Sequence, residues 1–408
     1  MTRGPKKTAC QRFYILLRDS CHHQDMSYTR NSTALMKRRT FVKSSLAAAA
    51  SSAALRFPLS LDESKTLRSS GAEKHLLTGT AVSSSQLKNP FLTPILVEQC
   101  NIVVAENEMK WDYVHPERDR YDFTAADELV AFGEKNSMKV RGHNLCWHKA
   151  QPPWLANVVT AENAARLLKE HIHSVAGRYA GRIHSWDVVN EAVDPEGGSK
   201  DGMRDSLWMQ LLGLRYIAIA FHAAAEADPK ALLTYNDFGL EEDSPSNELR
   251  RVVTLEFLKW MRRNRIPIHA LGLQSHLSAR YDNLPDWGGL HAFLKQVAKL
   301  DLQVFVTEFD IDDSELSTKS EKRERQVAEF CRDYLGNVLK HPQVSALLTW
   351  GMVSHRAYAS ENRHIALPLD ENLRKTLFLS AMIEAIGKRR EATLTTGETG
   401  CNFAGDRG

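Results

Sequence analysis

Two glutamates stand at the ends of short apolar runs in this sequence. Glu191 follows the run 186–190, and Glu308 follows the run 304–307. A pair of carboxyl groups can break the bond between two sugars, because one group protonates the leaving oxygen while the other, ionised, attacks the sugar. At about 5–5.5 Å the pair forms a covalent intermediate and retains configuration, whereas a wider gap admits water and inverts it. We take these two residues as the candidate catalytic pair.

Other polar and aromatic side chains follow further apolar runs. Amides, imidazoles, a lysine and indole rings suit sugars, because hydroxyl groups take paired hydrogen bonds and the C–H faces of sugar rings pack on aromatic rings. Each alone is as consistent with core packing or a structural hydrogen bond as with ligand binding. Their recurrence at successive strand ends favours a common site. The candidates are Glu106, Asn107, Lys110, His143, Trp147, Asn190, Asn236, Gln274, His276 and Trp350.

Eight apolar runs, alternating with amphipathic segments, must position these groups. The predicted strands are Leu76–Val82, Ile102–Ala105, Lys139–Cys146, Ile183–Val189, Ala231–Tyr235, His269–Leu273, Leu302–Thr307 and Ser345–Trp350. The predicted helices include Ala125–Lys135, Ala161–Tyr179, Leu207–Ala227, Asn247–Arg263, Leu290–Leu300 and Glu321–Lys340, with Thr124 and Thr160 as candidate caps. Apolar strands separated by helices imply a parallel sheet covered by helices.

Eight such units favour a closed (β/α)8 TIM barrel of the α/β class, folded as a single catalytic domain. That barrel carries its chemistry on loops at the carboxyl ends of the strands, where the candidate residues stand. The competing architecture is an open doubly wound sheet. It requires a glycine-rich phosphate loop after the first strand, and the segment that follows Gly79 provides none.

In spelling and order, these motifs resemble glycoside hydrolase family 10, the barrel xylanases. The resemblance covers roughly residues 75–385 and rests on motifs at 106–110, 142–148, 186–191, 274–276 and 307–310. It implies a retaining endo-1,4-β-xylanase that acts on xylan and xylo-oligosaccharides. In that enzyme Glu191 is the acid/base and Glu308 is the nucleophile.

The resemblance also implies places for the other candidates. Asn190 would bind the 2-hydroxyl of the sugar being cleaved. His276 would hydrogen-bond Glu308 and in turn be oriented by Asp310. The subsite before the cut would be lined by Lys110, His143, Trp147, Gln274 and Trp350, and the one beyond it by Glu106 and Asn107.

Three departures from the family pattern fall near the site. Gly239 stands where the family usually has Asn. In the loop after the last strand, Ser354 and Ala357 replace an Asp and a Ser, and Tyr358 stands at a second Trp. Because that loop roofs the cleavage subsite, we expect the changes to affect rate and the preference among xylan, mixed-linked glucan and short or aryl glycosides.

Three other functions remain open on the sequence alone. A related barrel glycosidase could act on another β-glycan. A non-catalytic glycan-binding protein on a decayed barrel finds support only in the altered loop. A metal-dependent amidohydrolase could use His143, His148 and His276, but the first strand supplies no His-x-His and Glu308 stays unexplained. We expect no metal and no other cofactor.

The charge distribution and the cysteine spacing limit which partners and metal sites are expected. The net charge is +3, but residues 1–70 hold thirteen Lys/Arg against four Asp/Glu, and the remaining chain holds 40 basic and 46 acidic residues. An acidic body argues against nucleic acid, because phosphate binding needs a basic surface. Cys100, Cys146 and Cys331 show no zinc-type spacing, so we expect buried thiols, with one bridge among them left open.

The first 70 residues are typical of a leader. Residues 1–35 are expected to be a non-structural extension, and residues 36–70 a twin-arginine-like export signal and linker, with Arg38 and Arg39 before the apolar run 44–55. A disordered basic tail on a cytoplasmic protein is the alternative. The run is too short to span a bilayer. We therefore expect a periplasmic or secreted monomer with its barrel at 71–388 and a disordered tail at 389–408.

Overall fold

The computed structural model describes residues 65–197, 201–279, 284–316, 319–356 and 364–390. The expected extension, the export signal and residues 391–408 of the expected tail lie outside the described residues. Two boundaries differ from expectation. Helix α2 (Leu67–Glu73) falls partly inside the expected linker, and its Leu67 is fully buried. Arg389, expected in the tail, donates to the carbonyl oxygens of Pro342 and Val344. The folded body therefore starts before residue 71 and extends past residue 388.

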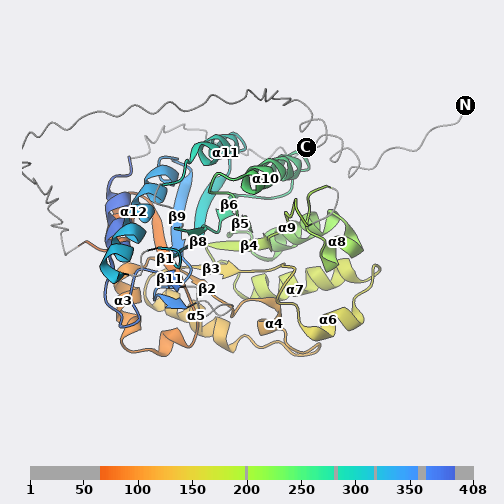
Figure 1. Ribbon diagram of the computed structural model, residues 1–408. Helices are drawn as coiled ribbons and strands as arrows, with labels where there is room; N and C mark the ends of the chain where they lie inside the picture. The colour runs from red at the N-terminus through yellow and green to blue at the C-terminus, as the bar shows by residue number, and fades with distance from the viewer. Residues whose placement is uncertain (1–64, 198–200, 280–283, 317–318, 357–363, 391–408) are drawn as a thin grey trace, which may run out of the picture. The chain divides into compact units, whose positions relative to one another are not determined.

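Eight parallel strands form a closed barrel at the centre of this body (Figure 1). They are β1 (Leu77–Val82), β2 (Ile102–Ala105), β3 (Lys139–His143), β4 (Ser185–Asn190), β5 (Leu232–Asp237), β6 (Ala270–Leu273), β8 (Gln303–Asp312) and β9 (Val344–Thr349). The sheet closes because β9 pairs in parallel with both β8 and β1. The predicted (β/α)8 barrel is confirmed. The seventh barrel strand, β8, continues five residues beyond the predicted end at residue 307.

Three short strands extend the sheet at the end of β8. They are β7 (His276–Ser278), β10 (His355–Arg356) and β11 (His364–Ala366). β7 pairs in parallel with β8, with His276 opposite Asp310. The long seventh strand therefore carries both Glu308 and the partner of His276.

Helices surround the barrel and connect its strands (Figure 1). In chain order after α2 they are α3 (Leu92–Gln99), α4 (Trp111–Val114), α5 (Thr124–Lys135), α6 (Pro153–Val158), α7 (Ala164–Arg178), α8 (Leu207–Leu212), α9 (Arg215–Ala227), α10 (Pro245–Arg263), α11 (Gly288–Ala298), α12 (Ser320–Val338) and α13 (Leu377–Gly387). The single helix predicted over 207–227 is divided into α8 and α9. Gly213, at φ +59°, ends α8 in a conformation that favours glycine. Among the described residues, no helix is both long and apolar enough to cross a membrane.

A side-chain hydrogen bond marks the start of α10. The Ser244 hydroxyl precedes α10 and accepts a hydrogen bond from the backbone N–H of Asn247 at 3.1 Å. The first residue of the helix is Pro245. The two caps predicted from sequence are wrong. Thr124 is itself the first residue of α5, and α7 begins after Asn163 rather than after Thr160.

The barrel interior is filled by side chains that point inward from alternate strand positions. A buried cluster of small and branched residues, with one phenylalanine, comprises Ala81, Ile102, Val104, Ala270, Phe305, Ala346 and Leu348. Two glycines allow close approach within this packing. A Cβ on Gly142 would lie 2.0 Å from the Trp186 ring, and one on Gly272 would lie 2.2 Å from Oδ1 of Asn236. The absence of a side chain at Gly272 therefore leaves room for the side-chain amide of Asn236 inside the barrel.

The three body cysteines are free and buried, as predicted for apolar thiols. Burial raises the pKa of the Cys100 thiol to about 12. These groups are therefore uncharged side chains of the core.

Candidate active site

Glu191 follows directly after β4 in an unusual backbone conformation, with φ +56°. Its backbone N–H donates a hydrogen bond to the backbone carbonyl of Asn236. Its own backbone carbonyl accepts a hydrogen bond from Nε of Arg204 at 2.7 Å. Positive φ is uncommon outside glycine and is maintained only where the surroundings fix it. These two bonds fix the backbone so that the carboxyl group enters the polar network at the barrel end.

Neutral donors surround the Glu191 carboxyl group. The indole nitrogen of Trp147 donates to Oε2 at 2.9 Å, and the amide of Gln274 donates to Oε1 at 3.1 Å. The Asn190 amide is 3.3 Å from the same Oε1. His148 lies 3.9 Å from Oε2, and burial with the nearby Arg204 charge lowers its pKa to about 4. At neutral pH, His148 therefore presents an uncharged ring to Glu191.

Glu308 lies in a different electrostatic environment. Asn236 donates to its Oε1 at 2.7 Å, and Nε2 of His276 is 3.2 Å from its Oε2. The other ring nitrogen of His276 contacts Asp310 at 2.8 Å. Desolvation opposes a charged imidazole, but the Asp310 and Glu308 carboxylates together hold the pKa of His276 well above its usual range. A protonated His276 donates from both nitrogens.

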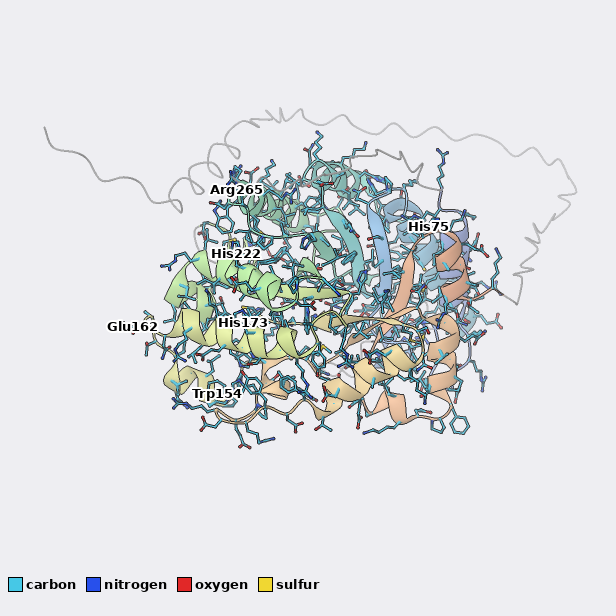
Figure 2. The ribbon with its side chains drawn as sticks, turned by 180° about the vertical axis from the view of Figure 1, so that it is seen from behind. His75, Trp154, Glu162, His173, His222 and Arg265 are labelled. Carbon is cyan, nitrogen blue, oxygen red and sulfur yellow. The ribbon has the colours of Figure 1, made fainter. Side chains whose placement is uncertain are left out.

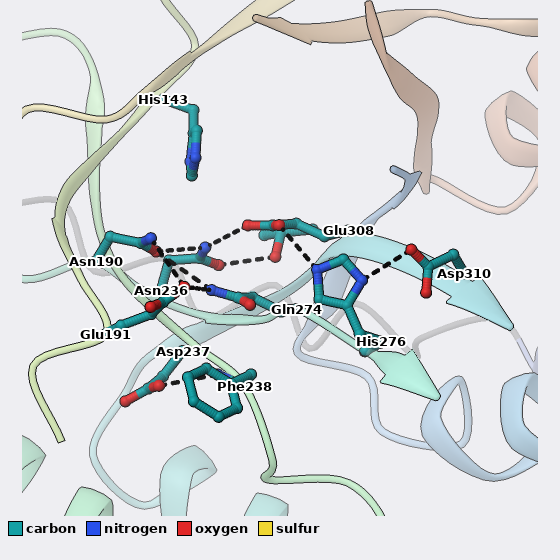
Figure 3. Close-up of polar contacts among 12 residues, drawn as sticks. His143, Asn190, Glu191, Asn236, Asp237, Phe238, Gln274, His276, Glu308 and Asp310 are labelled. Carbon is teal, nitrogen blue, oxygen red and sulfur yellow. Dashed lines mark hydrogen bonds and ion pairs between the residues drawn. The ribbon is translucent and has the colours of Figure 1, made fainter. Parts of the chain in front are cut away.

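The hydrogen bond from His276 is the largest of several effects that favour the ionised form of Glu308. Burial raises the pKa of Glu308, but the hydrogen bond from His276, the charges of His143 and His276, and the Asn236 amide together bring that pKa below its ordinary value. Figure 3 shows the resulting chain of contacts from Asp310 through His276 to Glu308. Glu308 is therefore an ionised carboxylate at neutral pH.

Asn236 and Asn190 connect the two carboxyl groups. The Asn236 amide nitrogen donates both to Glu308 and to Oδ1 of Asn190 at 2.9 Å, and its oxygen accepts from Thr307 at 2.7 Å. The acceptor role of the Asn236 oxygen fixes its amide orientation. Figure 3 shows Glu191 and Glu308 on the two sides of this amide bridge. The structure thus brings the predicted pair, Asn190, Asn236, Gln274 and His276 into one network.

Lys110, Asn107 and two tryptophans form the neighbouring part of the site. The ammonium of Lys110 donates to Oδ1 of Asn107 at 2.8 Å and lies 5.3 Å from the Trp147 ring centre and 5.9 Å from that of Trp350. Burial lowers the pKa of Lys110, and Glu308 opposes that shift. Burial raises the pKa of Glu106, and the like charge of Glu108 adds to the effect. Positive charge and indole faces therefore lie beside the carboxylate pair.

His143 is fixed by a buried pair that the sequence analysis did not single out. Asp187 accepts a hydrogen bond from Nδ1 of His143 at 3.0 Å and forms an ion pair with Arg141 inside the barrel. Both charged residues are essentially unexposed. The His143 ring also meets Trp350 edge-on, with centroids 5.2 Å apart. The available signal was the presence of two charged side chains inside otherwise apolar strands, which a buried ion pair requires. For Arg204, a loop residue, the sequence carried no signal.

The departures from the family pattern are explained in part. Gly239 adopts φ +67°, a region open to glycine and, among other residues, most readily to Asn. Either residue can therefore make this turn. Ser354 accepts the amide of Leu367 at 3.0 Å and donates to the carbonyl of Leu369 at 2.9 Å, which anchors the loop. Ala357 and Tyr358 lie outside the described residues.

The tuning of Glu308 by Asp310 gives a testable pH effect. Asp310→Asn removes the carboxylate that raises the pKa of His276, so His276 loses its proton at lower pH. A neutral His276 lowers the pKa of Glu308 less than a charged one, and Glu308 then becomes protonated at higher pH than before. We expect the acidic limb of kcat/KM against pH to move upward and kcat/KM at pH 5 to fall by about tenfold. The exposed Glu321→Gln should leave the profile unchanged, and an unshifted acidic limb in Asp310→Asn would contradict this account.

A closed parallel barrel with a carboxyl group directly after its fourth strand and another within its long seventh strand is typical of a glycoside hydrolase of the barrel class. The model of "Glycosyl hydrolase family 10" matches residues 66–385. The chain belongs to this family, and the resemblance read from its motifs is confirmed.

Relatives and solved structures agree with this assignment. A β-1,4-xylanase of Dictyoglomus thermophilum is 40% identical over 217 residues, which cover 53% of this chain and 58% of that protein. Endo-1,4-β-xylanase B of Thermotoga neapolitana is 34% identical over 276 residues, which cover 67% of this chain and 76% of that protein. The crystal structure of native xylanase 10B from Thermotoga maritima has a TM-score of 0.72 at 33% identity and covers 79% of this chain and 98% of that chain.

A further solved structure holds a ligand. Xylanase 10B from Thermotoga petrophila RKU-1, in complex with xylobiose, has a TM-score of 0.72 at 32% identity and covers 79% of this chain and 98% of that chain.

Proposed function

We propose that this glycoside hydrolase is an endo-1,4-β-xylanase that retains anomeric configuration, with Glu308 as nucleophile and Glu191 as acid/base. The observation that carries the proposal is the unequal environment of the two carboxyl groups. Glu308 is hydrogen-bonded to a cation, His276, whereas the donors on Glu191 are neutral. A cation favours the ionised form, and neutral donors orient a carboxyl group without adding charge. Glu308 is therefore suited to attack, which leaves the acid/base role to Glu191.

The reaction then runs in two steps. Glu191 gives its proton to the glycosidic oxygen while Glu308 attacks the anomeric carbon, and a covalent glycosyl-enzyme forms as the leaving chain departs. Esterification removes the negative charge of Glu308. Glu191, now ionised, takes a proton from water, and the water attacks the anomeric carbon from the face that the leaving group vacated. Two displacements restore the original configuration.

The residues around the pair are suited to hold the sugar during these steps. Asn190, which contacts Glu191 and Asn236, is placed to bind the 2-hydroxyl of the sugar being cleaved. The subsite before the cut is assigned to Lys110, His143, Trp147, Gln274 and Trp350. Asn107, the hydrogen-bond partner of Lys110, and Glu106 fall to the adjacent subsite. Pentose rings can pack on Trp147 and Trp350, and the lysine and amides can bind hydroxyl groups.

The similarity to proteins described as xylanases supports xylan as the substrate. The decisive experiment follows xylohexaose by proton NMR of the anomeric signals. We expect the β-anomer of the products to appear first, followed by slow mutarotation. Early α-anomer would show inversion. Intact xylohexaose beside a consumed mixed-linked glucan would show that the altered loop has moved the specificity. Binding without cleavage of any glycan would contradict the enzymatic proposal.

A further inference from the structure

A second cavity of about 410 Å³ lies outside the catalytic site, between α4, α6, α7 and the segment 115–121. Its volume falls within the ~300–1,000 Å³ that is typical of sites for small organic ligands. Figure 2 shows the region from behind, where Trp154 and Glu162 mark the edge of the molecule away from the strands. The residues that carry the argument are His115, Arg118, Tyr121, Trp154, Arg166 and Glu170.

A stack of buried rings separates this cavity from the carboxylate pair. Trp208 lines a small void beside Glu191 and stacks on Trp111, with centroids 5.4 Å apart. Trp111 stacks in turn on His171, with ring centroids 3.7 Å apart and an angle of 3° between the ring planes. Both of these rings line the second cavity. Ligand in the second cavity would therefore not contact the reacting atoms. The two sites are nevertheless linked by this one stack of rings.

Aromatic rings form one wall of the cavity. The rings of His115 and Tyr121 stack with centroids 3.8 Å apart, and the indole nitrogen of Trp154 donates to the His115 carbonyl at 3.0 Å. The Trp154 and His115 rings are tilted by 58° at 4.6 Å. These contacts fix the rings before any ligand arrives. Pre-positioned aromatic rings suit the C–H faces of a sugar.

Charged side chains make up another part of the lining, and their signs balance. The lining includes Arg118 and Arg166 together with Asp119 and Glu170, and Arg166 donates to both oxygens of Glu170, at 2.7 and 2.8 Å. Two cations and two anions give no net attraction for a phosphate or a metal ion. Guanidinium and carboxylate groups do offer paired donors and acceptors to neighbouring hydroxyls. The lining therefore favours a neutral, hydroxyl-rich ligand.

We propose that this cavity is a second xylan-binding site, which holds a short stretch of the polymer away from the point of cleavage. The inference rests on the proposed function, because it takes its ligand from the same substrate. A bound second stretch keeps the chain at high effective concentration near the catalytic cleft. The benefit therefore applies to polymeric and insoluble xylan and not to a disaccharide glycoside that fills only the cleft.

The test compares binding with turnover in two variants of the full chain. Trp154→Ala removes the aromatic wall, and Arg166→Ala removes an exposed guanidinium of α7 without disturbing the core. Lys169→Ala, exposed on the same helix but outside the lining, is the matched control. Each protein is mixed with insoluble xylan at 4 °C and the unbound fraction is measured. Each is also assayed for kcat/KM on a soluble aryl xylobioside.

We expect the two variants to bind insoluble xylan about three- to tenfold more weakly, with kcat/KM on the aryl xylobioside within twofold of the parent. Lys169→Ala should match the parent in both assays. Unchanged binding in Arg166→Ala, or a parallel fall in both assays, would overturn the second site. If the parent cleaves the aryl xylobioside but the variants bind as it does, the second site alone is refuted. If the parent neither binds nor cleaves xylan, the proposed function fails as well.

Discussion

Glu308→Gln should lower kcat by on the order of 10⁴-fold or more, on xylohexaose and on aryl xylobiosides alike. An amide is a far weaker nucleophile than a carboxylate, so no glycosyl-enzyme forms whatever the leaving group. Glutamine keeps the size of the side chain and one oxygen to accept from Asn236, which contacts Glu308 at 2.7 Å. The loss should therefore reflect chemistry, with KM changed much less than kcat.

Mass spectrometry adds a direct readout to the kinetics of Glu308→Gln. A 2-deoxy-2-fluoro xylobioside with an activated leaving group should label the parent once, on the peptide that holds Glu308, and leave the variant unlabelled. Glu226→Gln, an exposed change on α9, should be labelled like the parent. Label on another carboxylate, or more than about one per cent of parental activity in a pure variant, would remove Glu308 from the nucleophile role.

The barrel and the position of the candidate pair in it could be predicted because both depend on local patterns. Apolar strands alternating with amphipathic helices determine the architecture, and polar groups at the strand ends mark the site. Strand limits were predicted less well at β8, which continues to residue 312. The apolar run stops at Thr307, but the pairing of β8 with β7 continues the strand through polar Asp310. Periodicity cannot detect a pairing between distant segments.

The sequence showed which residues belong to the candidate site better than it showed the contacts that set their charges. The contact of His276 with Glu308 and Asp310 was implied only by the family resemblance, and the Arg141–Asp187 pair behind His143 was missed. Such contacts depend on which side chains of neighbouring strands meet inside the barrel. The register between neighbouring strands is set by the closed sheet as a whole, and the spacing of residues within one strand does not reveal it. The break between α8 and α9 was likewise missed, although Gly213 lies at that point.

Glu191→Ala should give a loss that depends on the leaving group, which distinguishes an acid/base from a nucleophile. On xylohexaose, whose leaving oxygen needs a proton, kcat/KM should fall by about 10²- to 10⁴-fold. On a dinitrophenyl xylobioside the leaving group needs no proton, so the first step should be nearly unaffected. The second step still lacks its base. A burst of dinitrophenol, followed by slow turnover, is therefore expected in stopped-flow measurements.

Azide provides the complementary test of Glu191→Ala. Azide needs no general base, so it should attack the accumulated glycosyl-enzyme, raise the slow turnover, and yield the β-xylobiosyl azide with retained configuration. The parent should not respond, because the Glu191 carboxylate repels the anion and water already reacts fast. Trp147 and Gln274 lose an acceptor in the variant, so Glu191→Gln, which keeps one, controls for their displacement. Equal losses on both substrates, with no burst and no azide response, would mean that Glu191 only positions the sugar. Because His276 is hydrogen-bonded to Glu308 and not to Glu191, Glu308 should still attack in the variant, and the expected result is a burst.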